Sequence, residues 1–285
     1  NLSLGATGIQ VWRDGSLAAE AGDAAARANV RSVRKSFLSA LYGVAVGDGL
    51  VDPGRTLAEM GIDDRGGLTE AEKRATVRDL LMARGGVYHP AAYESPALAR
   101  SHPPRQTHAP GEAWHYANWG FNALGTIYER ATGRGVFEAF AERIAAPTGM
   151  EDFAAAECRQ VFEPASDHPA HTMRVSARDL ARFGRLFLAR GSWAGRQVVP
   201  ASWVEESTTA WSQTGRAAPG YGYLWWVLGQ DDALGSGAYL AIGNGGQGLA
   251  VVPSHRTVVA QVVDVAEGRE RLQVTDFLTL VRSAA

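Results

Sequence analysis

The hydrophobic pattern of this chain changes its period twice, and that change constrains the fold more than any other feature. Residues 7–22 alternate around an Asp14-Gly15 pair, which is typical of a tight β-hairpin. From about residue 35 to 208, apolar residues recur at helical spacing instead. Short runs rich in β-branched and aromatic residues return at 221–228, 238–242, 248–252 and 257–265. We therefore predict an α+β fold in which the N- and C-terminal segments form one antiparallel sheet flanked by helices, with a helical lobe inserted.

Capping residues place helices in the inserted region and at the end of the chain. Thr76 and Asp79 form a capping box, and Gly85-Gly86 is the predicted stop. Ser176 and Asp179 repeat this pattern in a helix predicted to end at Gly191. Further helices are predicted over 37–46, 118–133, 200–208 and 270–282. We predict one domain over 1–285, with a sheet lobe of about 1–35 plus 200–285 and a mainly helical lobe of 36–199.

The composition argues against several classes of function. A net charge of −2 and the lack of a polybasic run predict neither a nucleic-acid partner nor a membrane partner. The hydrophobic fraction of 46% and the charged fraction of 20% are ordinary for a soluble globular protein. The single Cys158 cannot form an internal disulfide, so the cytoplasm is favoured, although a signal peptide removed before residue 1 fits the same sequence. The oligomeric state stays open.

The histidines do not form a recognisable metal motif. His168 and His171 are three residues apart and His102 and His108 are six apart, but all four stand in proline-rich, loop-like sequence. Neither H-E-x-x-H nor paired C-x-x-C occurs. We expect no metal and no cofactor.

Lys35 is unusual because only two of the 28 basic residues, Lys35 and Lys73, are lysines. A buried ammonium can lose its proton and act as a base, whereas a guanidinium stays charged. Lys35 follows Ser32 by three residues at the start of a predicted helix, so both side chains lie on one face. The run 37–46 has too many apolar residues for one stripe, which predicts a helix buried nearly all round. The pair has the parts of an activated nucleophile, while a capping serine beside a solvated lysine is the alternative.

Two further segments can supply the remaining parts of a nucleophilic site. Tyr116 and Asn118 follow a long loop, 86–115, which holds five prolines and four histidines and is expected to form the wall or lid of a pocket. Tyr116 can relay a proton or be held as phenolate. The alternative is that Tyr116 is a core residue and Asn118 only caps the following helix. Glycines at 243, 245, 246 and 248 let the backbone approach a ligand, although a glycine-rich hairpin explains them equally well.

The ordered motifs "SVRK", "YAN" and "GNGG", about 80 and 130 residues apart, resemble those of the penicillin-recognising serine hydrolases. That superfamily includes class C β-lactamases, DD-peptidases, family VIII carboxylesterases and 6-aminohexanoate-dimer hydrolases. The resemblance implies a β-lactamase/transpeptidase-like fold, with Ser32 as the acylated nucleophile, Lys35 as its base and Tyr116 as the proton carrier. It also implies that Asn118 binds Lys35 and the substrate. The backbone N–H groups of Ser32 and Gln247 would form the oxyanion hole.

The third motif departs from the pattern of the β-lactamases. They usually carry Lys-Thr/Ser-Gly, whereas this chain has Asn244-Gly245-Gly246 at the corresponding position. The resemblance implies that this triplet binds the substrate. A neutral residue loses a charge-assisted contact worth about 1.5–3 kcal/mol. The departure argues against a proficient β-lactamase and favours substrates without the carboxylate that this lysine binds.

The predicted function is therefore a serine hydrolase that cleaves small-molecule carboxylic esters or amides through an acyl-enzyme. Acyl transfer to an alcohol or amine is an alternative, because the sequence does not decide between water and another acceptor. A weak β-lactamase, or a sensor that β-lactams acylate without turnover, is the other alternative. Turnover distinguishes an enzyme from a sensor, because a sensor gives one stoichiometric burst.

Overall fold

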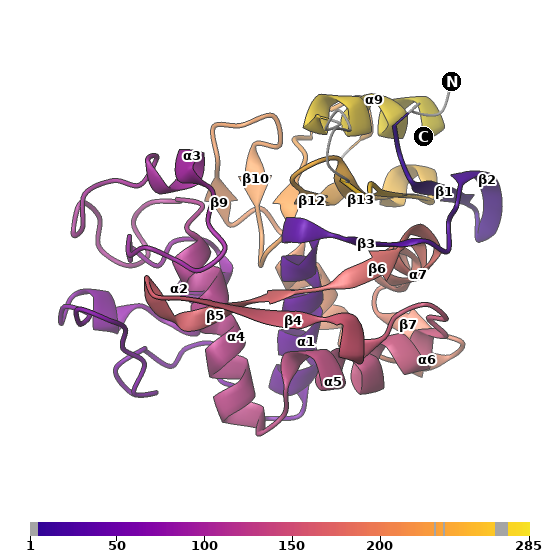
Figure 1. Ribbon diagram of the computed structural model, residues 1–285. Helices are drawn as coiled ribbons and strands as arrows, with labels where there is room; N and C mark the ends of the chain where they lie inside the picture. Colours follow the sequence, from indigo (N-terminus) through magenta and orange to yellow (C-terminus); the bar gives the residue numbers. More distant parts are fainter. Residues whose placement is uncertain (1–4, 231, 236, 266–272) are drawn as a thin grey trace.

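The two ends of the chain meet in one sheet, as the hydrophobic pattern predicts (Figure 1). A computed structural model describes residues 5–230, 232–235, 237–265 and 273–285. The antiparallel sheet has the order β2-β1-β14-β13-β12-β11-β10-β9. Its strands are β1 (Gly8–Arg13), β2 (Ser16–Gly22), β9 (Ser212–Gln213), β10 (Gly220–Tyr221), β11 (Trp226–Val227), β12 (Tyr239–Gly243), β13 (Gln247–Val252) and β14 (Thr257–Val262). Both turn residues of the first hairpin, Asp14 and Gly15, have positive φ, 49° and 80°, as a tight hairpin of this kind requires.

Helices cover both faces of this sheet. Alternate residues of β13 contribute to two cores: Leu249 and Val251 belong to the larger one, and Ala250 and Val252 to the smaller. Helix α7 (Ala177–Leu188) packs on the first face and α9 (Val274–Ala284) on the second. The predicted helix over 270–282 is confirmed from 274 onward, and 270–272 lie outside the described residues.

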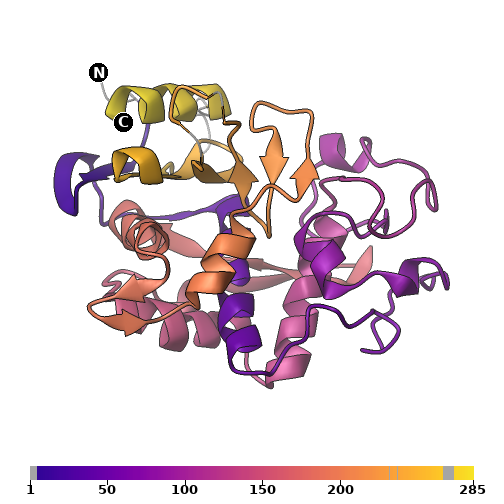
Figure 2. The ribbon, with the colours of Figure 1, turned by 180° about the vertical axis from the view of Figure 1, so that it is seen from behind.

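The helical region lies beneath the sheet in Figure 1, with α1 (Arg34–Gly47) at its centre. Every residue from Arg34 to Ala45 is buried, which confirms the prediction of a helix without a solvent face. Helices α4, α5 and α8 pack around α1, and Figure 2 shows α8 beside it. The helices of this region are α2 (Val77–Leu81), α3 (Pro96–Ala99), α4 (Asn118–Thr132), α5 (Val136–Phe140), α6 (Ala146–Thr148) and α8 (Ala201–Ser207). The two-lobe division stays a prediction; α7 packs on the sheet although its sequence lies within 36–199.

Three details differ from the predicted pattern. The inserted region also contains small strand pairs: β3 (Arg27–Asn29) with β6 (Arg174–Ser176), β4 (Arg159–Glu163) with β5 (Ser166–Thr172), and β7 (Ser192–Trp193) with β8 (Arg196–Gln197). The run 221–228 is two short strands rather than one, because the N–H groups of Tyr223 and Leu224 donate to Ser207 and Leu81 carbonyls outside the sheet. Helix α2 ends at Leu81, before the predicted Gly85-Gly86 stop, and Ala83 takes a left-handed φ of 55°.

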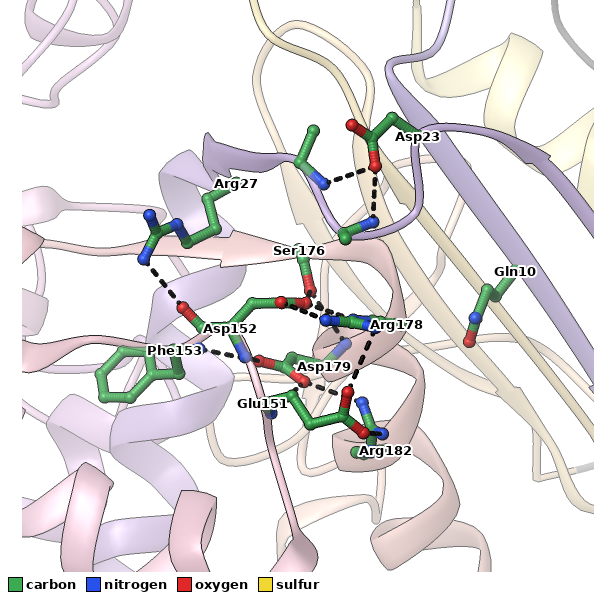
Figure 3. A network of polar contacts seen from close by, with 12 residues as sticks. Gln10, Asp23, Arg27, Glu151, Asp152, Phe153, Ser176, Arg178, Asp179 and Arg182 are labelled. Carbon is green, nitrogen blue, oxygen red and sulfur yellow. Dashed lines mark hydrogen bonds and ion pairs between the residues drawn. The ribbon is translucent and has the colours of Figure 1, made fainter.

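Buried Asp179 joins the start of α7 to the chain segment that precedes β4 (Figure 3). Ser176 caps the helix by accepting the Asp179 N–H, as predicted. The Asp179 carboxylate accepts the backbone N–H groups of Glu151, Asp152 and Phe153 at 2.8–3.0 Å. Arg182 Nη1 donates to the same carboxylate at 3.0 Å.

Asp179→Ala is expected to lower the free energy of unfolding by about 3–5 kcal/mol, because three partly buried N–H groups and a partly buried arginine lose their buried acceptor. Urea denaturation measures the change. Asp167→Ala is the control: its carboxylate is 56% exposed and pairs with Arg65, so its loss should cost at most about 1 kcal/mol. Equal effects of the two substitutions would contradict this assignment.

Within the described part of the chain, no helix combines the length and the apolar character needed to cross a membrane.

Candidate active site

Ser32 lies in a short 3-10 turn (Arg31–Val33) that leads directly into α1. The preceding residue, Arg31, has a φ of 51°, a left-handed conformation that is uncommon outside glycine. The Asn29 side chain holds this bend, because its Oδ1 accepts the Arg31 N–H at 3.0 Å. The 3-10 turn lies against β12 and β13. The bend therefore places Ser32 beside the two central strands of the sheet.

Lys35 is 2% exposed, and its amine contacts three polar groups. Nζ lies 3.1 Å from Ser32 Oγ, 2.7 Å from Tyr116 OH and 2.8 Å from Asn118 Oδ1. Burial and the neighbouring Arg34 lower the pKa of Lys35 well below 10.5, while Glu94 opposes them. The amide oxygen of Asn118 can only accept, so it takes one N–H of the amine. The lone pair of the neutral amine is then available to accept a proton from either hydroxyl.

Tyr116 stands beside this amine just before α4. Its ring lies 4.8 Å from that of Phe121 and stacks on Trp226 at 5.7 Å. Burial raises the pKa of the Tyr116 phenol, although a hydrogen bond with Ser32 and the charges of Arg34 and Arg216 oppose the shift. The protonated phenol is therefore favoured over the phenolate that the sequence left open.

Asn118 is the first residue of α4 and not its cap, which is Ala117. It is 7% exposed, and its Nδ2 donates to the Tyr93 carbonyl at 3.4 Å. The structure thus brings Ser32, Lys35, Tyr116 and Asn118 together from two distant segments.

The third motif forms the turn between β12 and β13. Gly245 and Gly246 have φ values of 88° and 94°, which strain any residue with a side chain. Two glutamines hold the turn: Gln261 Nε2 donates to the Gly246 carbonyl at 2.8 Å, and Gln247 Nε2 donates to the Val263 carbonyl at 2.6 Å. Strand β13 begins at Gln247, beside the Ser32 turn. The oxyanion hole of the Ser32 and Gln247 N–H groups stays a prediction.

Two cavities meet at Ser32. The larger, about 440 Å³, is polar, and Glu94 and Ser95 of the 86–115 loop line it beside Ser32 and Lys35. The smaller, about 290 Å³, is walled mainly by apolar side chains, among them Trp226, Leu240 and Ile242. Ser32, Tyr116, Arg216 and Asn244 line both. The long loop is therefore a wall of the site, as predicted.

Sequence reasoning missed other residues of this site. Arg34 lines the polar cavity from inside the S-x-x-K motif, and its position three residues before the run 37–46, predicted to be buried nearly all round, could have indicated its burial. Glu94 Oε1 lies 3.0 Å from His102 Nε2, and His102 Nδ1 lies 2.8 Å from His115 Nε2. Burial first, and then nearby His102, lower the pKa of His115 to about 4. The loop has no period from which these contacts could be predicted.

The histidines that the sequence analysis tested as metal ligands, His168 and His171, both contact protein groups. His171 Nε2 lies 3.1 Å from Glu129 Oε1, and His168 Nδ1 lies 3.0 Å from Thr126 Oγ1. Among the described residues, no group of three or more His, Cys, Asp or Glu side chains could hold a metal ion.

Known proteins share this fold. The family model named Beta-lactamase matches residues 5–281. An uncharacterised protein of Alkalihalophilus pseudofirmus is 24% identical over 258 residues, which cover 82% of this chain and 72% of that protein. A Bacillus anthracis structure provisionally assigned as a 6-aminohexanoate-dimer hydrolase has a TM-score of 0.75 at 21% identity, over 98% of this chain and 78% of that one. A Bacillus halodurans penicillin-binding protein also has a TM-score of 0.75, at 15% identity over 99% and 97% of the two chains. The family model covers nearly the whole chain and the solved structures share its fold, which confirms the resemblance stated from the sequence; the chain therefore belongs to the Beta-lactamase family.

Proposed function

We propose that this protein hydrolyses carboxylic esters or small amides through an acyl-enzyme on Ser32. The observation that carries the proposal is the buried amine of Lys35, which contacts both Ser32 Oγ and Tyr116 OH. Its lowered pKa makes the neutral amine available as a base.

In the first step, Ser32 Oγ attacks the substrate carbonyl and its proton passes to Lys35 Nζ. The N–H groups of Ser32 and Gln247 would stabilise the oxyanion of the tetrahedral intermediate. The Tyr116 phenol then gives its proton to the leaving alcohol or amine and regains one from Lys35. Water then attacks the acyl-enzyme and gives a proton to the neutral Lys35 amine, and Ser32 Oγ takes a proton back as it leaves, so that the acid is released.

Hydrolysis is favoured over a one-time acylation sensor by the intact set of proton carriers around Ser32. We expect repeated turnover of p-nitrophenyl butyrate, with more nitrophenol released than enzyme present. Intact-mass spectrometry should detect a butyryl adduct only transiently. A single stoichiometric burst followed by a stable adduct, with this ester or with a β-lactam, would instead identify a sensor. Acyl transfer would appear as an ester product when a second alcohol is added.

The fall of kcat/KM at low pH should follow the protonation of Lys35. Only the neutral amine accepts the Ser32 proton, so kcat/KM should fall as the pH drops through the lowered pKa of Lys35. Arg34→Met removes a positive charge that lowers this pKa, so the fall should move to higher pH. Profiles with p-nitrophenyl butyrate measure the shift, and the exposed Arg190→Met is the control. A fall that stays in place, or moves to lower pH, would exclude Lys35 as the titrating base.

A further inference from the structure

Arg34 is a buried cation that no group in the described part of the chain neutralises. Its side chain is 6% exposed and lines the polar cavity beside Ser32. Among the described residues, its guanidinium makes no ion pair and no hydrogen bond, and Nε is buried without a partner. A buried, unpaired guanidinium is costly, because it loses the hydration that the unfolded chain provides. A ligand that offers a negative charge would offset that cost.

The other charged groups of the polar cavity already have partners. Arg31 donates to the Tyr93 hydroxyl, and Arg216 lies 5.2 Å from the centre of the Trp114 ring. Glu163 Oε1 accepts the Tyr93 N–H at 3.0 Å.

Glu94 pairs with His102 through one oxygen; its other oxygen is buried without a partner, and its charge acts on Lys35. Three arginines therefore face two carboxylates, and Arg34 is the arginine of this cavity for which the described residues provide no partner.

We propose that Arg34 binds a carboxylate of the substrate, so that the enzyme acts on anionic esters or amides. The planar guanidinium can hold both oxygens of a carboxylate. The substrate would span Ser32, with its charged half in the polar cavity and its uncharged half against Trp226, Leu240 and Ile242. This inference rests on the proposed hydrolysis at Ser32.

The carboxylate would lie on a different wall from the one that the sequence analysis considered. Asn244 supplies no charge in the turn between β12 and β13, whereas Arg34 supplies one from the first turn of α1. The neutral third motif therefore does not remove the affinity of this site for all anions. It changes where the negative group of a substrate must lie relative to the bond that is cleaved.

Binding to the Ser32→Ala protein tests the subsite without turnover. Monomethyl succinate and dimethyl succinate differ by one carboxylate, and we expect the monoester to bind at least about tenfold more tightly by calorimetry. Arg34→Met in the same background should remove most of this difference, and Arg190→Met should not. Equal affinities for the two esters, or a preference that survives Arg34→Met, would overturn the proposal. Should Arg34→Met not fold, equal affinities in the Ser32→Ala protein would overturn it by themselves.

Kinetics with three chromogenic esters then locates the charged half. The esters are p-nitrophenyl butyrate, p-nitrophenyl hemisuccinate with an anionic acyl group, and 3-carboxy-4-nitrophenyl butyrate with an anionic leaving group. We expect Arg34→Met to lower kcat/KM for one anionic ester by about 10–100-fold relative to the neutral ester. The ratio of kcat/KM for the anionic ester to kcat/KM for the neutral ester cancels any effect of the substitution on Lys35, because all three esters use the same base. If the esters are hydrolysed and Arg34→Met leaves this ratio unchanged, the carboxylate subsite is overturned. If calorimetry shows Arg34-dependent binding but no ester is hydrolysed, the subsite is supported and hydrolysis at Ser32 is rejected.

Discussion

Ser32→Ala is expected to lower kcat for every ester substrate by a factor of about 10⁴ or more, because no acyl-enzyme can form. The folded protein should lose little stability, since Ser32 is partly exposed at the mouth of the two cavities. A fluorophosphonate or sulfonyl fluoride probe should add its mass to Ser32 in the unsubstituted protein and to no residue of the variant. Ester turnover and peptide mapping measure the two effects.

Ser36 and Ser39 are the natural competitors, because they stand in the same stretch of sequence. Both are 1% exposed or less. Ser36 Oγ donates to the Leu224 carbonyl at 2.8 Å, so it points away from the cavities. Neither should react with the probe. An adduct on Ser36 or Ser39, with Ser32→Ala still active, would reject Ser32 as the nucleophile.

The part of the site that is local in sequence could be predicted from spacing. Ser32 and Lys35 are one helical turn apart, so their contact follows from the helix alone. The contacts of Lys35 with Tyr116 and Asn118 span more than 80 residues, and only the resemblance to a family indicated them. Arg34 was overlooked because arginines are common in this chain, although it stands just before the run 37–46 that was predicted to be buried.

The fold was predictable where the hydrophobic period was unambiguous. The hairpin at Asp14-Gly15 and the helices at 118–132 and 177–188 have clear periods and capping residues, and all three form. The run 221–228 has the composition of one strand, yet two carbonyls from α2 and the end of α8 bind its middle. Such competition between backbone partners is set by tertiary structure and leaves no local pattern.

Lys35→Arg is expected to lower kcat by a factor of about 10²–10⁴ although it keeps the positive charge. A guanidinium stays protonated near neutral pH, so it cannot accept the Ser32 proton. The site is also too small for it: Nζ lies within 3.1 Å of Ser32, Tyr116 and Asn118, and 4.6 Å from the centre of the Phe121 ring. Stopped-flow or steady-state hydrolysis of p-nitrophenyl butyrate measures the loss.

The matched control is Lys73→Arg, because the chain offers one other lysine. Lys73 Nζ pairs with Asp63 at 3.2 Å near the surface, and an arginine can make the same contact. Its replacement should change stability by no more than about 0.5 kcal/mol and leave kcat unchanged. Thermal melting checks the folding of both variants, since Arg at position 35 would add a second permanent charge beside buried Arg34.

Lys35→Met removes the base without adding that charge and should show a loss of the same order. A folded Lys35→Arg or Lys35→Met protein that keeps more than about a tenth of the original kcat would exclude Lys35 as the general base.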